Sequence, residues 1–309
     1  MSKFVIIPDI TCDLSEELRT HFGLEDYVTG YVHIDDESIV TTLDWSNISR
    51  ENFYKTLSDK RRTVTSAVAS PEEFYRVFKK YAEQGYDIIS MSLSSKISST
   101  FSVATSACER VSAEFGVKTH SVDTLRMSGS FGLLVAYALE LRRGGADFDS
   151  VVAWLEENKH KVHQMGPIDD LTFIARRGRI SKGKAIMGNL AGVKPMGDSN
   201  TDGYVTVLAK AKGIKRALDA TVEYTKRMMS DPKENYIFVM HSDRESYALE
   251  LRDKLESSID CRGVFVSDVF SGCGTNIGPG MISVYFLGEP VSEDNAREKE
   301  VLTAILAEL

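Results

Sequence analysis

The chain has 309 residues, of which 42% are hydrophobic, and its formal net charge is −8. This length and hydrophobic content are enough for a sizeable buried core and exclude a disordered chain. The acidic balance argues against general nucleic-acid binding, which needs a basic face.

The first half of the chain alternates between strand and helix patterns. Short apolar runs predict strands at residues 4–7, 87–91 and 119–122. Helical spacing and capping signals predict helices at residues 15–22, 70–81, 101–115, 128–143 and 149–158. Repeated strand–helix units of this kind predict a mostly parallel sheet with helices on both faces.

The second half has longer connections and alternating strands. Strands are predicted at residues 204–208, 236–240, 264–269 and 282–287, and helices at 215–229 and 244–255. We therefore expect a two-domain α/β protein whose second sheet is mixed or antiparallel. The expected divisions are residues 1–163, residues 164–288, and a C-terminal linker and helix over 289–309.

The cysteines and the N-terminus indicate the cellular setting. Cys12, Cys108, Cys261 and Cys273 are far apart, so we expect no metal site, no disulfide framework and no cofactor. The chain starts with a strand-like run in place of a signal peptide, and no window is apolar for long enough to span a bilayer. These features predict a cytoplasmic protein.

Residues 92–100, which we call the hydroxyl run, carry six hydroxyl side chains and a single charge, that of Lys96. Hydroxyls at the carboxyl end of a strand, beside the free N–H groups of the next helix, form a site for an anion. Neutral donors suit a carboxylate or phosphate that is held and not hydrolysed. Helix capping and turn formation explain the same hydroxyl run about equally well.

Thr65 and Ser66 end another short strand-like segment. If this segment belongs to the first sheet, its end lies at the same edge as Ser94, Ser95 and Ser98, where binding crevices of open α/β sheets occur. The alternative is that these residues reflect only strand propensity and a turn before the next helix.

Residues 178–185 match the pattern GxxxxGK of a phosphate-binding loop, but Ala185 stands where Ser or Thr would hold Mg²⁺. We therefore do not predict such a loop. A basic cluster remains, formed by Arg176, Arg177, Arg179, Lys182 and Lys184. It is either a solvated surface, or it supplies one arginine to an anion and leaves the rest for a partner.

Residues 272–280 hold four glycines and a proline between two predicted strands. They are expected to form a loop, either a wide turn or one that brings backbone N–H groups and Asn276 close to a ligand. Asp9, Asp13 and Asp123 follow strands and are expected to cap helices. The spacings yield no set of nucleophile, base and orienting acid, so we predict no catalytic residues.

Several short segments resemble motifs of the DegV family, whose members include the fatty-acid-binding subunits of bacterial fatty acid kinase. Residues 9–14 are similar to its D-S-T-x-D-L, Thr65-Ser66 before Ser70-Pro71 to T-S-Q-P-S-P, and residues 94–101 to S-S-x-L-S-G-T-Y. Residues 178–181 resemble G-R-I-S, residues 193–195 I-K-P, and residues 278–280 G-P-G. The order and spacing of these motifs extend the resemblance over about residues 4–288.

The resemblance implies a long-chain fatty acid bound between two α/β domains, with its acyl chain in an apolar pocket. Its carboxylate would be held by Thr65 and a serine of the hydroxyl run, Ser98 first and Ser94 or Ser95 second. Arg179 would supply positive charge through water. The full set of expected binding residues is Thr65, Ser66, Ser94, Ser95, Ser98, Arg179 and Asn276.

The resemblance also implies that the protein has no catalytic activity alone. A separate ATP-dependent kinase would phosphorylate the bound carboxylate. Transient membrane contact is also an open alternative for the protein. Two departures bear on this. Ile10 stands where the family often has Ser, and Asn276 stands where kinase-linked members usually have His. Asn cannot carry the proton or charge of His, so the kinase partnership is in question while lipid binding is not.

Two other functions remain open at this point. The protein could be a hydrolase or transferase in which the hydroxyl run and the basic cluster bind the phosphate of a small molecule. Alternatively, the basic cluster could dock a protein partner in a purely regulatory binding module.

Overall fold

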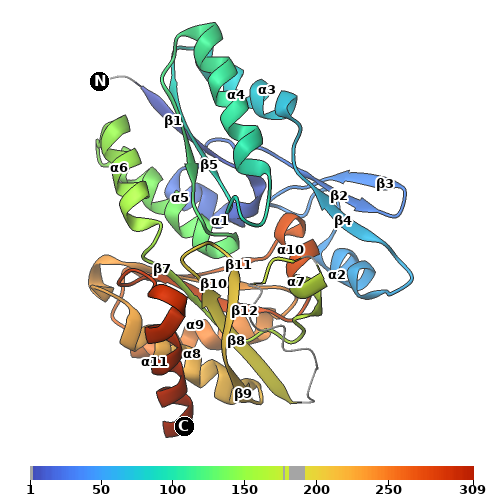
Figure 1. The fold of residues 1–309 in the computed structure, drawn as a ribbon, viewed down its shortest axis with the longest axis vertical. Coiled ribbons are helices and arrows are strands. Elements are labelled where there is room, and N and C mark those ends of the chain that lie inside the picture. Colours follow the sequence, from blue (N-terminus) through green and yellow to red (C-terminus); the bar gives the residue numbers. More distant parts are fainter. Residues whose placement is uncertain (1–2, 177, 181–191) are drawn as a thin grey trace.

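The computed structural model describes residues 3–176, 178–180 and 192–309, which form two α/β domains with one long helix between them (Figure 1). The first domain is built on a parallel sheet with strand order β1-β5-β6. These strands are β1 (Phe4–Pro8), β5 (Asp87–Ser92) and β6 (Thr119–Asp123).

Helices cover both faces of this sheet. Val5, Ile7 and Ile88 pack against the helices α3 (Pro71–Ala82) and α4 (Thr100–Phe115). Phe4, Ile6 and Ile89 point to the opposite face, because successive side chains of a strand alternate. That face is covered by α1 (Glu16–Phe22), α5 (Ser128–Arg143) and α6 (Phe148–Asn158). The predicted parallel sheet with helices on both faces is confirmed.

Helix α5 joins the two domains. Its residues 128–139 are all buried, as expected for a helix that is apolar on every side. It contacts β1 of the first sheet and β7, β10 and β12 of the second. The helix therefore belongs to the core of both domains, and the hydroxyl run lies near its start, since the Ser94 N–H donates to the Arg126 carbonyl.

The second domain has a mixed sheet with strand order β11-β10-β12-β7. Its strands are β7 (Val162–Met165), β10 (Tyr236–His241), β11 (Gly263–Asp268) and β12 (Ile282–Leu287). Only β10 and β11 pair in parallel, and β12 runs antiparallel to both of its neighbours. The prediction of a mixed sheet is confirmed. Strand β7 spans residues 163 and 164, where the sequence predicts the domain boundary.

The outer face of this sheet is covered by α8 (Ile214–Met228), α9 (Glu245–Ser258) and the C-terminal α11 (Ala296–Glu308). A hairpin of β8 (Val193–Ser199) and β9 (Val205–Lys212) lies beside β7. The described residues also form three short 3-10 helices: Ile10–Cys12, Pro232–Glu234 and Glu293–Asn295. Within the described ranges, no helix is long and apolar enough to cross a membrane.

A third, small sheet was not predicted. It is antiparallel, with the order β3-β2-β4, and consists of β2 (Tyr31–Ile34), β3 (Glu37–Val40) and β4 (Val64–Ala67), packed on α2 (Arg50–Ser58). Of the two alternatives left open for Thr65 and Ser66, the one that places their segment in the first sheet is therefore excluded. Val64 packs instead with Val32, Phe53 and Tyr54 in a core of its own.

Two local predictions are corrected as well. Residues 271–277 form a short helix, α10 (Ser271–Ile277), and not the expected loop. Glycine serves close packing there, since a Cβ atom on Gly274 would come within 2.9 Å of the Tyr54 hydroxyl. The helix predicted to start at residue 149 is α6, which starts at Phe148 and is capped by Asp147 through a hydrogen bond from the Ser150 N–H.

Candidate functional site

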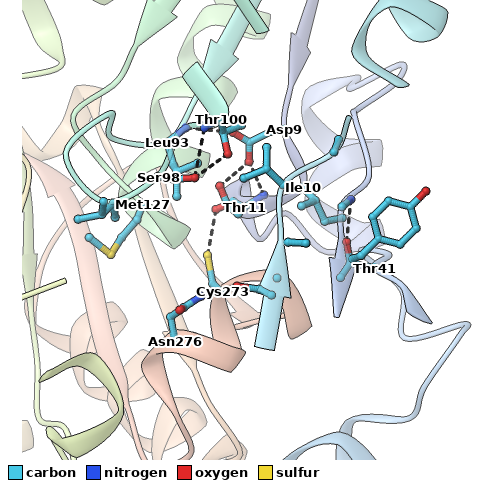
Figure 2. Close-up of a pocket in the computed structure, with 18 of the residues that line it drawn as sticks. Asp9, Ile10, Thr11, Thr41, Leu93, Ser98, Thr100, Met127, Cys273 and Asn276 are labelled. Atoms are coloured by element: carbon cyan, nitrogen blue, oxygen red, sulfur yellow. Dashed lines mark hydrogen bonds between the residues drawn. The ribbon is translucent and has the colours of Figure 1, made fainter. Parts of the chain in front are cut away.

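A cavity lies where the hydroxyl run, the small sheet and helix α10 meet (Figure 2). It contains about 890 Å³ of space not filled by atoms, the open mouth included, which is a usual size for a ligand pocket. The helix α7 (Thr172–Arg176) and the strand β9 close one side of it through Ile174 and Val205. Its apolar wall includes Val28, Val68, Phe74, Leu93, Ile97 and Ile277.

Four of the predicted binding residues line this cavity: Ser66, Ser98, Arg179 and Asn276. They come from four separate regions of the chain, and only the tertiary fold brings them together. Apolar side chains surround this small group of polar ones, which is the usual composition of a site that orients a ligand by a few placed donors.

Ser98 lies at the start of α4, on the cavity side of the hydroxyl run. Its Oγ lies 2.8 Å from the Thr100 hydroxyl and accepts a hydrogen bond of 3.2 Å from the Thr100 N–H. Thr100 also lines the cavity (Figure 2). The two hydroxyls and the helix N-terminus form a set of donors without a positive side chain, which suits an anionic group.

Arg179 supplies positive charge to the cavity. Its Nε donates to the Ile97 carbonyl over 3.1 Å, so the guanidinium lies beside the hydroxyl run. Its own carbonyl accepts from the Val205 N–H, which anchors this segment to β9. The arginine is therefore held at the cavity by contacts with both domains.

Three predicted residues, Thr65, Ser94 and Ser95, are not among the residues that line the cavity. Thr65 precedes Ser66 on β4, and neighbouring strand residues point to opposite faces. Ser94 is fully buried, and its hydroxyl accepts from the Lys96 N–H. Ser95 is exposed and donates from its backbone N–H to Asp123.

A signal in the sequence would have selected Ser66. In the family motif T-S-Q-P-S-P, the threonine stands five positions before the final proline. Counting back from Pro71 gives Ser66 and not Thr65. The pair Thr65-Ser66 therefore matches the first two letters of the motif but is one position out of register with its end.

Asp9 lines the cavity and was expected only to cap a helix. It does cap the first 3-10 helix, since one carboxylate oxygen accepts from the N–H and hydroxyl of Thr11. The other oxygen accepts from the Leu93 N–H over 3.0 Å. Burial raises the pKa of Asp9 to about 6. An anionic ligand beside Asp9 therefore meets a second carboxylate, whose charge depends on pH.

Asp13 and Asp123 do not cap helices as expected. Asp123 accepts from the N–H groups of Ser95 and Leu125 and so holds a turn. Asp13 is fully buried, and it accepts from the Ser128 hydroxyl at 2.6 Å and from the Phe270 N–H at 3.0 Å. Burial raises the pKa of Asp13 to about 8, so this carboxyl is mostly protonated at neutral pH.

Asp13 therefore links the first 3-10 helix to α5 and α10. Cys273 of α10 packs at the same place, with its Sγ 3.5 Å from the Thr11 carbonyl, and it lines the cavity (Figure 2). Burial and the two aspartates raise the pKa of Cys273 well above its usual value, so the group is a thiol and not a thiolate. It is an apolar part of the cavity wall.

A second cavity of about 510 Å³, measured in the same way, adjoins the first. Met127, Ile174, Val205 and Ile277 line both of them. The second cavity lies between these side chains and the inner face of the second sheet. The two cavities together extend from the polar residues at the mouth to a mostly apolar interior.

Part of the predicted basic cluster lies outside the described residues, namely Arg177, Lys182 and Lys184, as does most of the GxxxxGK match. Among the residues that the structure describes, no group of three or more His, Cys, Asp or Glu side chains could hold a metal ion. The chemistry of the site is accordingly built on its hydroxyl, amide, carboxyl and guanidinium groups.

Comparison with known proteins places the whole chain in one family. Residues 3–289 match the model of the DegV family, described as a family of uncharacterised proteins. A DegV domain-containing protein of Clostridium perfringens is 30% identical over 290 residues, which are 94% of this chain and 99% of the relative. One from Caldanaerobacter subterraneus is 29% identical over 286 residues, 93% and 99% of the two chains.

Solved structures share the fold. A DegV family protein from Thermus thermophilus, described as binding fatty acid, has a TM-score of 0.82 and 25% identity, with 93% of this chain and 99% of that one covered. DegV from Bacillus subtilis, described as a fatty acid binding protein, has a TM-score of 0.80 and 22% identity, with 94% and 100% covered.

Proposed function

The chain belongs to the DegV family, and from this premise we propose that it binds a long-chain fatty acid in the two adjoining cavities. The observation that carries the proposal is the pair of cavities itself. Polar donors gather at one end, and apolar side chains from both domains line the rest. A ligand with one anionic head and a long apolar chain matches this distribution.

The acyl chain provides most of the affinity. Burying one CH₂ group contributes about 0.8 kcal/mol, so a chain of many methylenes needs only a few polar contacts to orient it. Met127, Ile174 and Ile277 line both cavities and would contact the middle of the chain. The second cavity then receives the part of the chain that lies farthest from the carboxylate.

The head group is assigned to the polar residues at the mouth. Ser98 and Ser66 would donate hydroxyl hydrogen bonds to the carboxylate, with Asn276 as a further amide donor. Arg179 would contribute positive charge, directly or through water. The relative from Thermus thermophilus, which is 25% identical, is described as binding fatty acid, and this supports a fatty acid as the ligand.

In this account the protein lies in the cytoplasm, where it holds and presents its ligand. It does not itself convert the ligand chemically. Presentation to a separate kinase, with formation of an acyl phosphate, is part of the proposal. Asn276 can donate a hydrogen bond in such a complex but cannot carry a proton. The mostly apolar wall of both cavities favours a lipid over the small phosphorylated substrate of a hydrolase or transferase.

Equilibrium binding of isotopically labelled palmitic and oleic acids to delipidated protein tests the proposal. We expect saturable binding of one acid per chain, with weaker binding by Ser98→Ala and no change in Ser95→Ala. Labelled acid that fails to bind, or binds equally to both variants and to an unrelated acidic protein, would contradict it.

A further inference from the structure

The second cavity has polar side chains in its otherwise apolar wall. Gln164 lies on β7, and Ser283 and Tyr285 lie on β12, which pairs with β7. Tyr285 is the register partner of Gln164, and Ser283 is two residues away from Tyr285. Paired residues and residues two apart point to the same face of a sheet, so all three face the first domain.

This placement agrees with the packing of their neighbours. Phe238 and Met240, the register partners of Tyr285 and Ser283 on β10, belong to the core around α5. His163, next to Gln164, points to the other face and bonds to Asp198. The three polar side chains are therefore inside the molecule, on the wall of the cavity.

The Gln164 side chain lacks a partner in this environment. Gln164 is 9% exposed, and its backbone N–H donates to Asp198. Its side-chain amide forms no hydrogen bond with any other residue in the described part of the chain. The amide faces a cavity that the proposed ligand fills, and an amide that a ligand covers without forming a hydrogen bond costs free energy.

Hydroxyl groups lie beside it. The Tyr285 hydroxyl belongs to a residue that is 1% exposed and lines the same cavity. The Ser283 hydroxyl donates a long hydrogen bond of 3.5 Å to the Val284 carbonyl. Hydrogen-bond donors and acceptors thus lie together on the wall of the second cavity, where a plain acyl chain offers only CH₂ groups.

We propose that the preferred ligand is a long-chain fatty acid with an oxygen substituent, a hydroxyl or keto group, on the part of the chain that enters the second cavity. The Gln164 amide and the Ser283 hydroxyl bond to that oxygen. This inference rests on the proposed fatty acid function and names its substrate class.

An oxygenated fatty acid is preferred because binding a plain fatty acid costs free energy at Gln164. A plain acyl chain covers the Gln164 amide and leaves it without water or a partner. A site that is built to hydrogen-bond a substrate oxygen discriminates strongly against the analogue without it, since buried polar groups are then left unpaired. The oxygenated acid fills the same volume and satisfies the amide.

Competition against a fluorescent fatty acid tests this inference on the full-length, delipidated protein. The competitors are stearic acid, a series of octadecanoic acids with one hydroxyl at successive positions, and the corresponding keto acids. We expect at least one oxygenated isomer to bind about tenfold more tightly than stearic acid, the ratio for one added hydrogen bond. A keto series that matches the hydroxy series identifies the ligand oxygen as an acceptor.

Variants locate the effect. Gln164→Leu should bind stearic acid more tightly and the favoured isomer more weakly. The ratio of the affinities for the favoured isomer and for stearic acid should therefore approach one. Ser283→Ala provides a second test if Gln164→Leu fails to fold. Leu171→Met changes an apolar residue of the same cavity and should keep the ratio of the unmodified protein.

Three results would overturn the inference. If stearic acid binds and no oxygenated isomer binds more tightly, the substrate class is wrong while the fatty acid function stands. If the preference survives both Gln164→Leu and Ser283→Ala, the oxygen is bound elsewhere. If none of the acids binds, the proposed function fails together with the inference.

Discussion

The side-chain amide of Asn276 donates a hydrogen bond to the Ser66 hydroxyl over 2.9 Å. Asn276 lies on α10, which follows β11 of the second domain in the chain and packs on the small sheet, and Ser66 lies on β4 of that sheet. Both residues line the first cavity, so the bond crosses between two separate parts of the chain at the polar end of the site.

This bond predicts that Asn276→Ala releases a bound fatty acid faster. The loss of one hydrogen bond of about 0.5–1.5 kcal/mol corresponds to roughly a two- to tenfold faster release. Stopped-flow transfer of a fluorescent acid to acceptor vesicles measures the rate. Thr65→Ala, one position from Ser66 on β4, is the control and should leave it unchanged. If Ser66→Ala adds its full effect to Asn276→Ala, the two side chains are not coupled.

Ser98→Ala should weaken fatty acid retention with little effect on the fold. A hydrogen bond to a charged group contributes about 1.5–3 kcal/mol, so we expect at least a tenfold loss of affinity. Equilibrium titration measures this loss, and thermal unfolding checks stability. Ser95→Ala, in the same run but exposed, should bind as the unmodified protein does. Equal affinities for the two variants would mean that the head group lies elsewhere.

Asp9 should make fatty acid binding depend on pH. Its pKa is raised to about 6 by burial, and an anionic head group in the same cavity raises it further. Affinity should therefore fall as the pH rises from about 6 to 8, by up to about tenfold for each added unit of the Asp9 pKa. Asp9→Asn should flatten this profile, and Asp123→Asn should not. Parallel profiles for the unmodified protein and Asp9→Asn would contradict the assignment.

Asp13 should make stability depend on pH in a defined direction. Its folded-state pKa is about 8 and its ordinary value is 3.8, so the folded state holds the proton more tightly. Its stabilising contribution is complete below about pH 4 and is lost as the pH rises to about 8, by an amount of the order of a few kcal/mol.

Asp13→Asn replaces the protonated acid by a neutral amide of the same shape. The variant should unfold at a nearly constant temperature between pH 6 and 8, over a range in which the unmodified protein loses stability. Differential scanning calorimetry measures this difference, with the exposed Asp36→Asn as control. A variant whose stability falls with pH as steeply as that of the unmodified protein would show that Asp13 is not the titrating group.

Met127 should control passage between the two cavities. It is 8% exposed and lines both of them. A Trp side chain at this position would exclude the acyl chain from the second cavity, and each CH₂ left outside costs about 0.8 kcal/mol. Met127→Trp should therefore bind stearic acid far more weakly and octanoic acid nearly unchanged. An equal loss for both acids would mean a general disturbance of the fold.

Local signals were sufficient for most of the architecture. The helix α3 has a complete capping box at Ser70 and Glu73, and β1 and β5 are short apolar runs followed by polar residues. These patterns depend on near neighbours in the chain, and the structure has the elements where they are predicted. The mixed second sheet follows in the same way from its alternating strands.

Features that depend on distant contacts were not predictable. Strand β4 pairs with β2, and no sequence motif predicts this pairing. Because side chains alternate along β4, Ser66 faces the cavity and Thr65 does not. The glycines of α10 allow contact with Tyr54, 220 residues earlier in the chain at Gly274, and not a wide turn. The raised pKa values of Asp9 and Asp13 arise from burial, which only the assembled core provides.

The most direct measurement is mass spectrometry of the lipid carried by the purified protein, both in the native complex and after organic extraction. The account predicts a mass increase equal to one long-chain fatty acid per chain, and recovery of that acid in the extract. Protein that carries no fatty acid, and takes none up when it is incubated with a mixture of long-chain acids, would contradict it.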